Sequence, residues 1–376
     1  MSRSPTATRM VLLMLTVVAQ HCCRASPQTN AFSGAATYFL GITNFSRFDR
    51  SSGANASETV LTSSGIAVPV SWDEVVLSWN AIAPDGACLK FEARGIYPER
   101  CTKYYTLGIW SEDNSISRRE SVNGQADDDG DVKTDILVLK RSGARLQLRI
   151  TLATPDKAIP SQIRYLGVSF LNTQAARLPQ EPKRAAWGKI LSVPERSQVP
   201  YGERQGWCSP TSSSMVLAYW AKALGRPELD LSVPEVAKGV YDRNWPGTGN
   251  WPFNTAFAGK FPGIRAYVTR LNGISDLEEY VLAGVPIILS VSYDLLHAKK
   301  VERNSGHLIV CVGFTSEGEV VANDPWARLE RGERVQKIFP RDDVAKAWKQ
   351  SHNTVYIIHP ESLTGQFSIL SKPCLE

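Results

Sequence analysis

A cysteine at the predicted start of a helix is the residue of this sequence best suited to nucleophilic chemistry. Cys208 is followed by Ser209 and Pro210, and the fixed φ of proline suits the first turn of a helix. We expect this helix to run from Ser209 to Leu224. A free thiol is mostly protonated at neutral pH, and the unpaired N–H groups and dipole of a helix N-terminus favour its thiolate form. The sequence therefore predicts that Cys208 is a nucleophile.

A nucleophilic thiol needs a base, and His307 is the best placed histidine to supply one. It opens the strongly apolar predicted strand His307–Phe314, so a polar side chain stands at the mouth of a buried strand. The next predicted strand, Glu319–Asn323, ends just before Asp324. If the two strands form a hairpin, the start of one meets the end of the other, which places Asp324 beside His307 as the orienting group.

The motifs around these residues resemble a known family. In chain order the motifs are Ser197-Gln198, Trp207-Cys208-Ser209-Pro210-Thr211-Ser212, Gly306-His307 and Asn323-Asp324-Pro325. This order of Gln, Cys, His and Asp is similar to that of the C39-like cysteine peptidases, the bacteriocin-processing type within the papain-like fold, and in particular of their secreted members. The resemblance covers the segment from Leu191 to Pro360.

The resemblance implies a role for each matching residue. Cys208 would be the nucleophile, His307 the general base and then the general acid, and Asp324 the residue that fixes the imidazole. Gln198 would donate a side-chain N–H group to the oxyanion hole, beside the backbone N–H of Cys208. The gap between Gln198 and Cys208 is longer than in the bacteriocin-processing members, which leaves Gln205 as a rival oxyanion donor.

The activity implied by the resemblance is hydrolysis of a peptide or related amide bond through a thioester intermediate. The substrate would be a peptide or protein, and no metal or organic cofactor is implied. Many relatives have glycine where this chain has Ser209. Two alternatives stay open: an acyltransferase that uses the same triad, and a catalytically silent protein that binds cell wall or carbohydrate.

The first half of the chain reads as a β-sandwich. Between about residues 31 and 173 the sequence is dominated by strand-like segments, and in Leu89–Arg94 and Leu146–Leu152 apolar and polar residues alternate. Few helical stretches interrupt them, which is typical of a sandwich. The Gln-, Arg- and Pro-rich segment Gln174–Arg184 is predicted to be a linker, so we expect a β-sandwich domain over residues 26–185 and a C39-like peptidase domain over residues 186–376.

The second half mixes helices and strands, so the predicted fold class is α+β, with the papain-like peptidase domain following the sandwich. Helices are expected first and a sheet afterwards. Ser232 and Ser275 are the expected N-caps of the two later helices. The expected helices are Ser209–Leu224, Val233–Val240 and Asp276–Leu282, and the expected strands are Val285–Ser292, His307–Phe314, Glu319–Asn323 and Thr354–His359.

Residues 1–25 read as a secretion signal. Arg3 and Arg9 precede the apolar run Met10–Ala19, and small residues surround a cleavage point before Ser26. No later run is long enough to span a membrane, so we expect a secreted or periplasmic protein with no integral membrane segment after signal removal. Without the three arginines of this segment the chain has 39 basic and 37 acidic residues, a balance that argues against a nucleic-acid partner.

Three further patterns have two interpretations each. Cys88 and Cys101 are close enough in sequence to pair, while Cys311 reads as a small buried hydrophobe that shares a strand face with His307. The acidic run Asp127–Asp131 is a solvated turn in preference to a Ca²⁺ site. Aromatic residues of the first domain are core residues in preference to a glycan platform, although cell-wall or glycan contact through this domain stays open. These aromatic residues are Trp72, Trp79, Tyr104, Tyr105 and Trp110.

Overall fold

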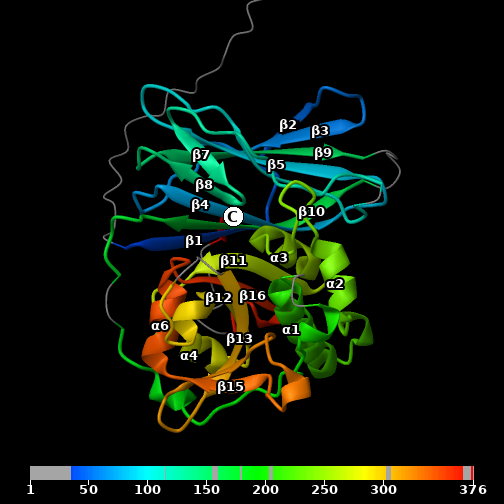
Figure 1. Ribbon diagram of the computed structural model, residues 1–376. Coiled ribbons are helices and arrows are strands. Elements are labelled where there is room, and N and C mark those ends of the chain that lie inside the picture. Colours follow the sequence, from blue (N-terminus) through cyan, green and yellow to red (C-terminus); the bar gives the residue numbers. More distant parts are fainter. Residues whose placement is uncertain are drawn as a thin grey trace, which may run out of the picture.

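The computed structural model describes residues 35–114, 116–154, 160–177, 180–202, 206–301, 306–366 and 374–375. The predicted signal segment and Gln205 lie outside the described residues. The fold is α+β, with two stacked β-sheets in the first half of the chain and a sheet flanked by helices in the second (Figure 1). The expected class and order of the domains are confirmed, while the boundary at residue 185 stays a prediction.

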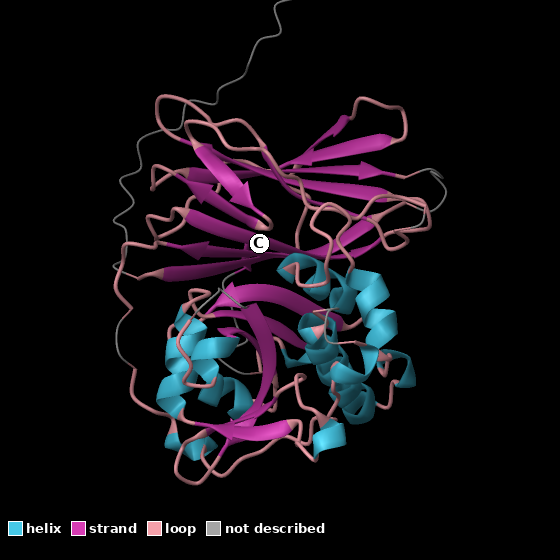
Figure 2. Cartoon of the chain, viewed as in Figure 1, coloured by secondary structure: helices cyan, strands magenta, loops and turns pink. Residues whose placement is uncertain are grey.

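The two sheets of the N-terminal domain form a sandwich, as the alternating sequence predicts (Figure 2). Strand β9 shows the reason most clearly, because its leucines and Ile150 are buried while the polar residues between them are partly exposed. The first sheet has the order β17 (Cys374–Leu375), β1 (Thr37–Ile42), β10 (Gln162–Leu171), β4 (Glu74–Ile82), β8 (Ile136–Leu139) and β7 (Gly130–Lys133). The second has the order β2 (Asp49–Ser52), β3 (Glu58–Thr62), β9 (Arg145–Ala153), β5 (Cys88–Ile96) and β6 (Tyr105–Trp110).

The second domain is built around one antiparallel sheet. Its strand order is β11 (Ile264–Arg270), β16 (Thr354–Pro360), β12 (Ile287–Ser292), β13 (Gly306–Phe314), β14 (Val320–Asn323) and β15 (Gln336–Phe339). In Figure 1, α1, α2 and α3 lie together on one flank of this sheet and α4 and α6 on the other. The helices are α1 (Cys208–Leu224), α2 (Val233–Val240), α3 (Trp251–Gly259), α4 (Ile274–Leu282), α5 (Tyr293–Leu296) and α6 (Arg341–Lys349).

Two expectations about this domain are wrong. Helices do not all precede the sheet, because β11 follows α3 directly and α6 lies between β15 and β16. Ser275 is not the N-cap of α4, which begins two residues earlier than expected, with Gly273 at the cap position. The carboxylate of Asp276 instead accepts a hydrogen bond from the backbone N–H of Asn272 at 2.8 Å. Ser232 does cap α2, in a capping box with Glu235.

The two domains share one hydrophobic core. Strands β4 and β10 are buried along almost their whole length, because one face covers the other sheet of the sandwich and the other packs on β11 and α3. The side-chain amide of Asn80 pairs with the backbone of Ala266 in both directions, at 2.6 and 3.1 Å. Arg270 and Glu74 form an ion pair across the same boundary, at 2.8 Å.

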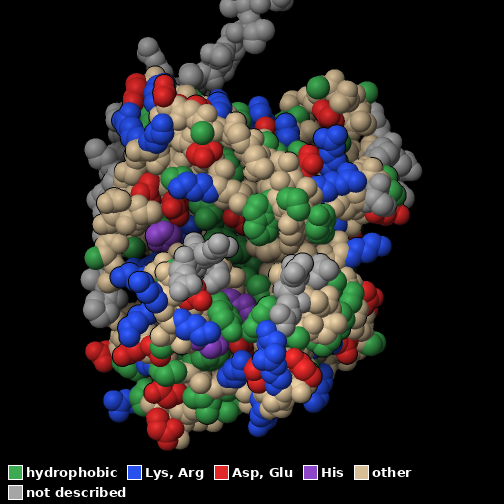
Figure 3. Space-filling model, in the orientation of Figure 1, with side chains coloured by type: hydrophobic (Ala, Val, Ile, Leu, Met, Phe, Trp, Pro, Cys, Tyr) green, Lys and Arg blue, Asp and Glu red, His purple; other side chains and the backbone are tan. Residues whose placement is uncertain are grey.

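The surface is of mixed charge. Lys and Arg side chains alternate with Asp and Glu side chains over the face seen in Figure 3. Within the described part of the chain, every helix is too short or too polar to cross a membrane.

Candidate active site

Cys208 is the first residue of α1, which begins one residue before the predicted start at Ser209. Its side chain is buried, with 9% of the residue exposed. Two serines that follow it bind neighbouring elements and fix the start of the helix. Ser209 lies 3.0 Å from the hydroxyl of Tyr356 on β16, and Ser212 donates to the backbone oxygen of Leu308 on β13 at 3.1 Å. The helix start is therefore held directly against the strand that carries His307.

His307 is the second residue of β13, and it is buried between the thiol and a carboxylate. Its Nε2 atom lies 2.8 Å from Oδ1 of Asp324, which leaves Nδ1 as the nitrogen for Cys208. Burial works to lower the pKa of His307, but hydrogen bonds to Asp324 and Cys208 outweigh it and raise the pKa to about 9. The imidazole is therefore protonated at neutral pH, in the form that stabilises a neighbouring thiolate.

Asp324 reaches His307 because β13 and β14 form the expected hairpin. Its Oδ1 atom also accepts the backbone N–H of Trp326 at 2.9 Å, and its Oδ2 atom accepts a hydrogen bond from Lys337 at 2.9 Å. Burial of the carboxyl group works to raise its pKa, but His307 and Lys337 together hold the pKa well below its usual range. The carboxylate is thus fixed in place by three donors and stays ionised.

Lys337 was not found from the sequence. It lies on β15, in register with Ala322 of β14, two positions before Asp324. A second hairpin after Asp324 was the signal that could have revealed it. The strand is only four residues long and carries Ile338, which is 64% exposed, so its apolar pattern is weak.

Gln198 lies beside the thiol and the imidazole at one cavity of about 270 Å³. Its backbone N–H donates to the oxygen of Pro325 at 2.9 Å, which ties it to the segment after Asp324. The residue is 2% exposed, and its Oε1 atom has no hydrogen-bond partner among the described residues. A buried amide with one free end can rotate to present its N–H group to a ligand in the cavity.

The remaining wall of this cavity is mostly aromatic and glycine. The ring of Tyr293 stands edge-on to His307, with centroids 5.4 Å apart, and 6.3 Å from the ring of Trp326. Neither aromatic residue was predicted, because a single Tyr at the start of a one-turn helix or a single Trp in a turn has no periodic signal. The lining residues are Gln198, Gly206, Cys208, Tyr293, Gly306, His307 and Trp326.

Among the described cysteines, Cys88, Cys101 and Cys311 are not part of this site. Cys311 is fully buried within β13, as expected, and burial raises its pKa to about 12. Cys88 and Cys101 do not pair with each other, contrary to one interpretation of the sequence. Cys88 begins β5, whereas Cys101 forms a bridge to Ile96 at the far end of that strand. Eight residues of extended chain separate the two ends by about 26 Å, far beyond disulfide reach.

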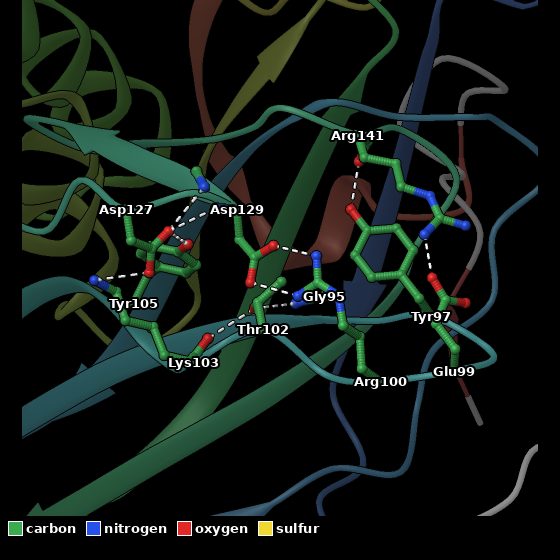
Figure 4. A network of polar contacts seen from close by, with 11 residues as sticks. Gly95, Tyr97, Glu99, Arg100, Thr102, Lys103, Tyr105, Asp127, Asp129 and Arg141 are labelled. Carbon is green, nitrogen blue, oxygen red and sulfur yellow. Dashed lines mark hydrogen bonds and ion pairs between the residues drawn. The ribbon is translucent and has the colours of Figure 1, made fainter.

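The acidic run of the N-terminal domain forms a turn whose carboxylates are bound by Lys and Arg side chains (Figure 4). Asp127 accepts a hydrogen bond from the hydroxyl of Tyr105 at 2.5 Å and pairs with Lys103 at 3.0 Å. Asp129 accepts two hydrogen bonds from Arg100, one of them at 2.6 Å. In the part of the chain that is described, no cluster of His, Cys, Asp or Glu could hold a metal ion. The contacts of Asp127 and Asp129 with the side chains of Tyr105, Lys103 and Arg100 agree with the interpretation of this run as a turn.

The aromatic residues of the sandwich are core residues, with one exception. Trp79 stacks on Phe91 with ring centroids 4.0 Å apart, and Trp110 is 1% exposed. Tyr104 is half-buried on the outer face of the second sheet, between the guanidinium groups of Arg94 and Arg149. A platform of stacked aromatic rings for a glycan is therefore not formed by these residues.

In a comparison with known proteins, two family profiles match this chain, one in each half. The profile of the Peptidase C39 N-terminal domain matches residues 44–170, and the profile of the Peptidase C39 like family matches residues 190–356. A crystal structure described as that of a C39-like peptidase from Bacillus anthracis is 18% identical, with a TM-score of 0.36; the match covers 46% of this chain and 98% of that one. No curated protein matches the chain.

Proposed function

We propose that this protein, which belongs to the C39-like peptidase family, is a cysteine hydrolase that cleaves peptide or related amide bonds. The observation that carries the proposal is the buried chain of contacts from Cys208 through His307 to Asp324, with 2.8 Å between the last two. Such a chain has the order nucleophile, base and orienting group that acyl transfer through a thiol requires.

In the proposed reaction the Cys208 thiolate attacks the carbonyl carbon of the substrate, and the carbonyl electrons move onto oxygen. The oxyanion is held by the backbone N–H of Cys208 and the side chain of Gln198. His307 gives its Nδ1 proton to the departing amine, which leaves a thioester on the sulfur. Neutral His307 then takes a proton from water, whose oxygen attacks the thioester, and the acid product leaves while the thiolate and imidazolium are restored.

Asp324 keeps the imidazole oriented through both halves of this cycle. Its Oδ1 atom accepts hydrogen bonds from Nε2–H of His307 and the backbone N–H of Trp326, while Lys337 holds its Oδ2 atom. The aromatic wall of Tyr293 and Trp326 suits an apolar side chain of the substrate beside the scissile bond. Residues 1–25 support export, so we place the protein outside the cytoplasmic membrane, secreted or periplasmic.

The test is labelling of Cys208 with a fluorescent iodoacetamide, read at the residue by mass spectrometry, together with turnover of a peptide library. We expect rapid labelling at neutral pH in the wild type and slow labelling in His307→Ala, because the thiolate loses its imidazolium. Cys88→Ser is the matched control, since it removes a half-buried thiol from the other domain. Equal labelling of wild type and His307→Ala, with no peptide cleaved, would replace the hydrolase by a silent binding protein.

A further inference from the structure

An arginine of the N-terminal domain is buried in the peptidase domain. Arg119 is 1% exposed, and its guanidinium donates to the backbone oxygens of Lys238 at 3.1 Å, Tyr241 at 3.2 Å and Gly239. These oxygens belong to the last turn of α2 and the residue after it, where helix carbonyls have no partner within the helix. Arg119 therefore caps α2 from the other domain.

The segment that follows α2, Tyr241–Asn250, is organised by one buried carboxylate. Asp242 is fully buried, and its Oδ1 atom accepts the backbone N–H groups of Ser121 at 3.0 Å, Asn244 at 3.0 Å and Trp245 at 3.1 Å. The first of these donors belongs to the N-terminal domain. Asn244 returns the contact by donating its side-chain N–H to the oxygen of Ser121 at 2.9 Å. The segment is thus bound to the N-terminal domain by paired hydrogen bonds.

The same segment borders the candidate active site. The hydroxyl of Thr248 donates to the oxygen of Gly206 at 3.4 Å, and Gly206 lines the cavity two residues before Cys208. Asn254 of α3 donates to the oxygen of Thr248 at 2.8 Å. A continuous path of hydrogen bonds therefore leads from the N-terminal domain through Tyr241–Asn250 to the rim of the cavity.

We propose that the N-terminal domain is a brace for the substrate cleft, and that Arg119 is a positioning residue that holds Tyr241–Asn250 against Gly206. The proposal rests on Cys208 being the nucleophile. The braced segment would keep Gly206 in position at the wall of the cavity, against which an extended peptide binds, and leave the thiol chemistry to α1, β13 and Asp324. The shared core of the two domains supports a fixed arrangement, because an interface of this kind does not open and close.

Two alkylating probes separate the cleft wall from the thiol chemistry. Iodoacetamide needs only the thiolate, whereas a tripeptidyl vinyl sulfone with leucine side chains must also bind in the cleft. We expect Arg119→Met and Thr248→Val to slow the vinyl sulfone about tenfold, because a displaced wall misplaces the peptide, and to change the iodoacetamide rate less than about twofold. Arg118→Met is the matched control, since that side chain is 73% exposed and pairs only with Glu120 among the ion pairs found.

Hydrogen exchange of residues 242–249 provides a readout that does not depend on Cys208. Exchange should be faster in Arg119→Met than in Arg118→Met, and unchanged exchange overturns the brace. An unchanged ratio of the two probe rates in Thr248→Val also overturns it, and this variant decides the matter if Arg119→Met fails to fold. Failure of iodoacetamide to label Cys208 in the wild type contradicts the proposed nucleophile instead, and the exchange data then judge the brace alone.

Discussion

Cys208 and Cys311 are two buried cysteines of the same domain, 9% and 0% exposed, in very different surroundings. Cys311 lies inside β13, paired with Ile287 of β12, and burial raises its pKa to about 12. Cys208 stands at the start of α1 and hydrogen-bonds to the imidazole of His307. Burial alone keeps a thiol protonated, so a reactive buried thiol needs a helix start or a cation beside it, and Cys208 has both a helix start and the imidazole of His307.

One strand supplies both environments. His307 and Cys311 lie on β13, four residues apart. Of this strand, only the first two residues, Gly306 and His307, line the cavity. The side chain of Cys311 approaches the backbone oxygen of Gly313 at 4.0 Å instead. The start of the strand therefore carries the residue proposed for chemistry, and its buried middle carries the residue that packs the core.

The largest effect should come from exchanging each cysteine for alanine. We expect Cys208→Ala to lower kcat of peptide hydrolysis by about 10⁶-fold, because Cys208 supplies the only thiol among the described residues that line the cavity. Cys311→Ala should keep kcat and KM within about twofold, since its sulfur only fills space, and should lose about 1–2 kcal/mol of unfolding free energy. Steady-state kinetics and urea unfolding measure both. Residual turnover in Cys208→Ala above a hundredth of the wild-type rate would contradict the assignment.

The next largest effect concerns Asp324. Asp324→Ala leaves His307 buried without its carboxylate, so the imidazole loses its orientation and its pKa falls from about 9. We expect kcat/KM to fall by about 10³ to 10⁴-fold. Under denaturing conditions, iodoacetamide should label Cys208 equally in this variant and in the wild type. Asp230→Ala is the control, because that carboxylate is 55% exposed and pairs with Arg196 at the surface. Equal losses in the two variants would remove Asp324 from the site.

An element of this domain could be predicted from the sequence only where its apolar residues form a recognisable pattern. The hairpin of β13 and β14 could be predicted because two apolar runs flank the turn at Gly318, and so Asp324 could be placed beside His307. Helix α3 escaped prediction because eight of its nine residues are buried, which leaves no polar face to reveal a helical period. Strand β11, similarly buried, escaped for the same reason.

Sequence distance misleads where a strand intervenes. Cys88 and Cys101 are close in the sequence, yet β5 extends between them and holds them at its two ends. Contacts between domains were also beyond prediction, since Arg119 and Asp242 reach each other's elements only once both folds exist. The chemistry-bearing residues could be found because their types are rare at such positions, whereas a capping arginine looks like any other.

The protonation of His307 predicts a pH dependence for the site and for stability. Its pKa in the folded protein, about 9, lies above the ordinary value of 6.5, so protonation favours the folded state. This contribution is fully present below pH 6.5 and is lost as the pH rises through about 9. We expect turnover to fall about tenfold per unit above pH 9, because the amine then leaves without its proton. Thermal unfolding at pH 6 and pH 9.5 should show a smaller difference in His307→Gln than in the wild type.

Substitution of Lys337 should shift the pH profile of turnover without abolishing activity. It gives the smallest expected effect on the surroundings that distinguish Cys208 from Cys311. Its ammonium group lies 2.9 Å from Oδ2 of Asp324 and draws on the same carboxylate that stabilises the imidazolium. In Lys337→Met the whole negative charge acts on His307, so the alkaline limb of kcat should move to higher pH, by less than about one unit. Lys346→Met is the control, since that side chain is 69% exposed beside Asp343. A limb that moves to lower pH would mean that Lys337 acts by holding Asp324 in place, because losing the carboxylate's position lowers the pKa of His307 more than losing the cation raises it.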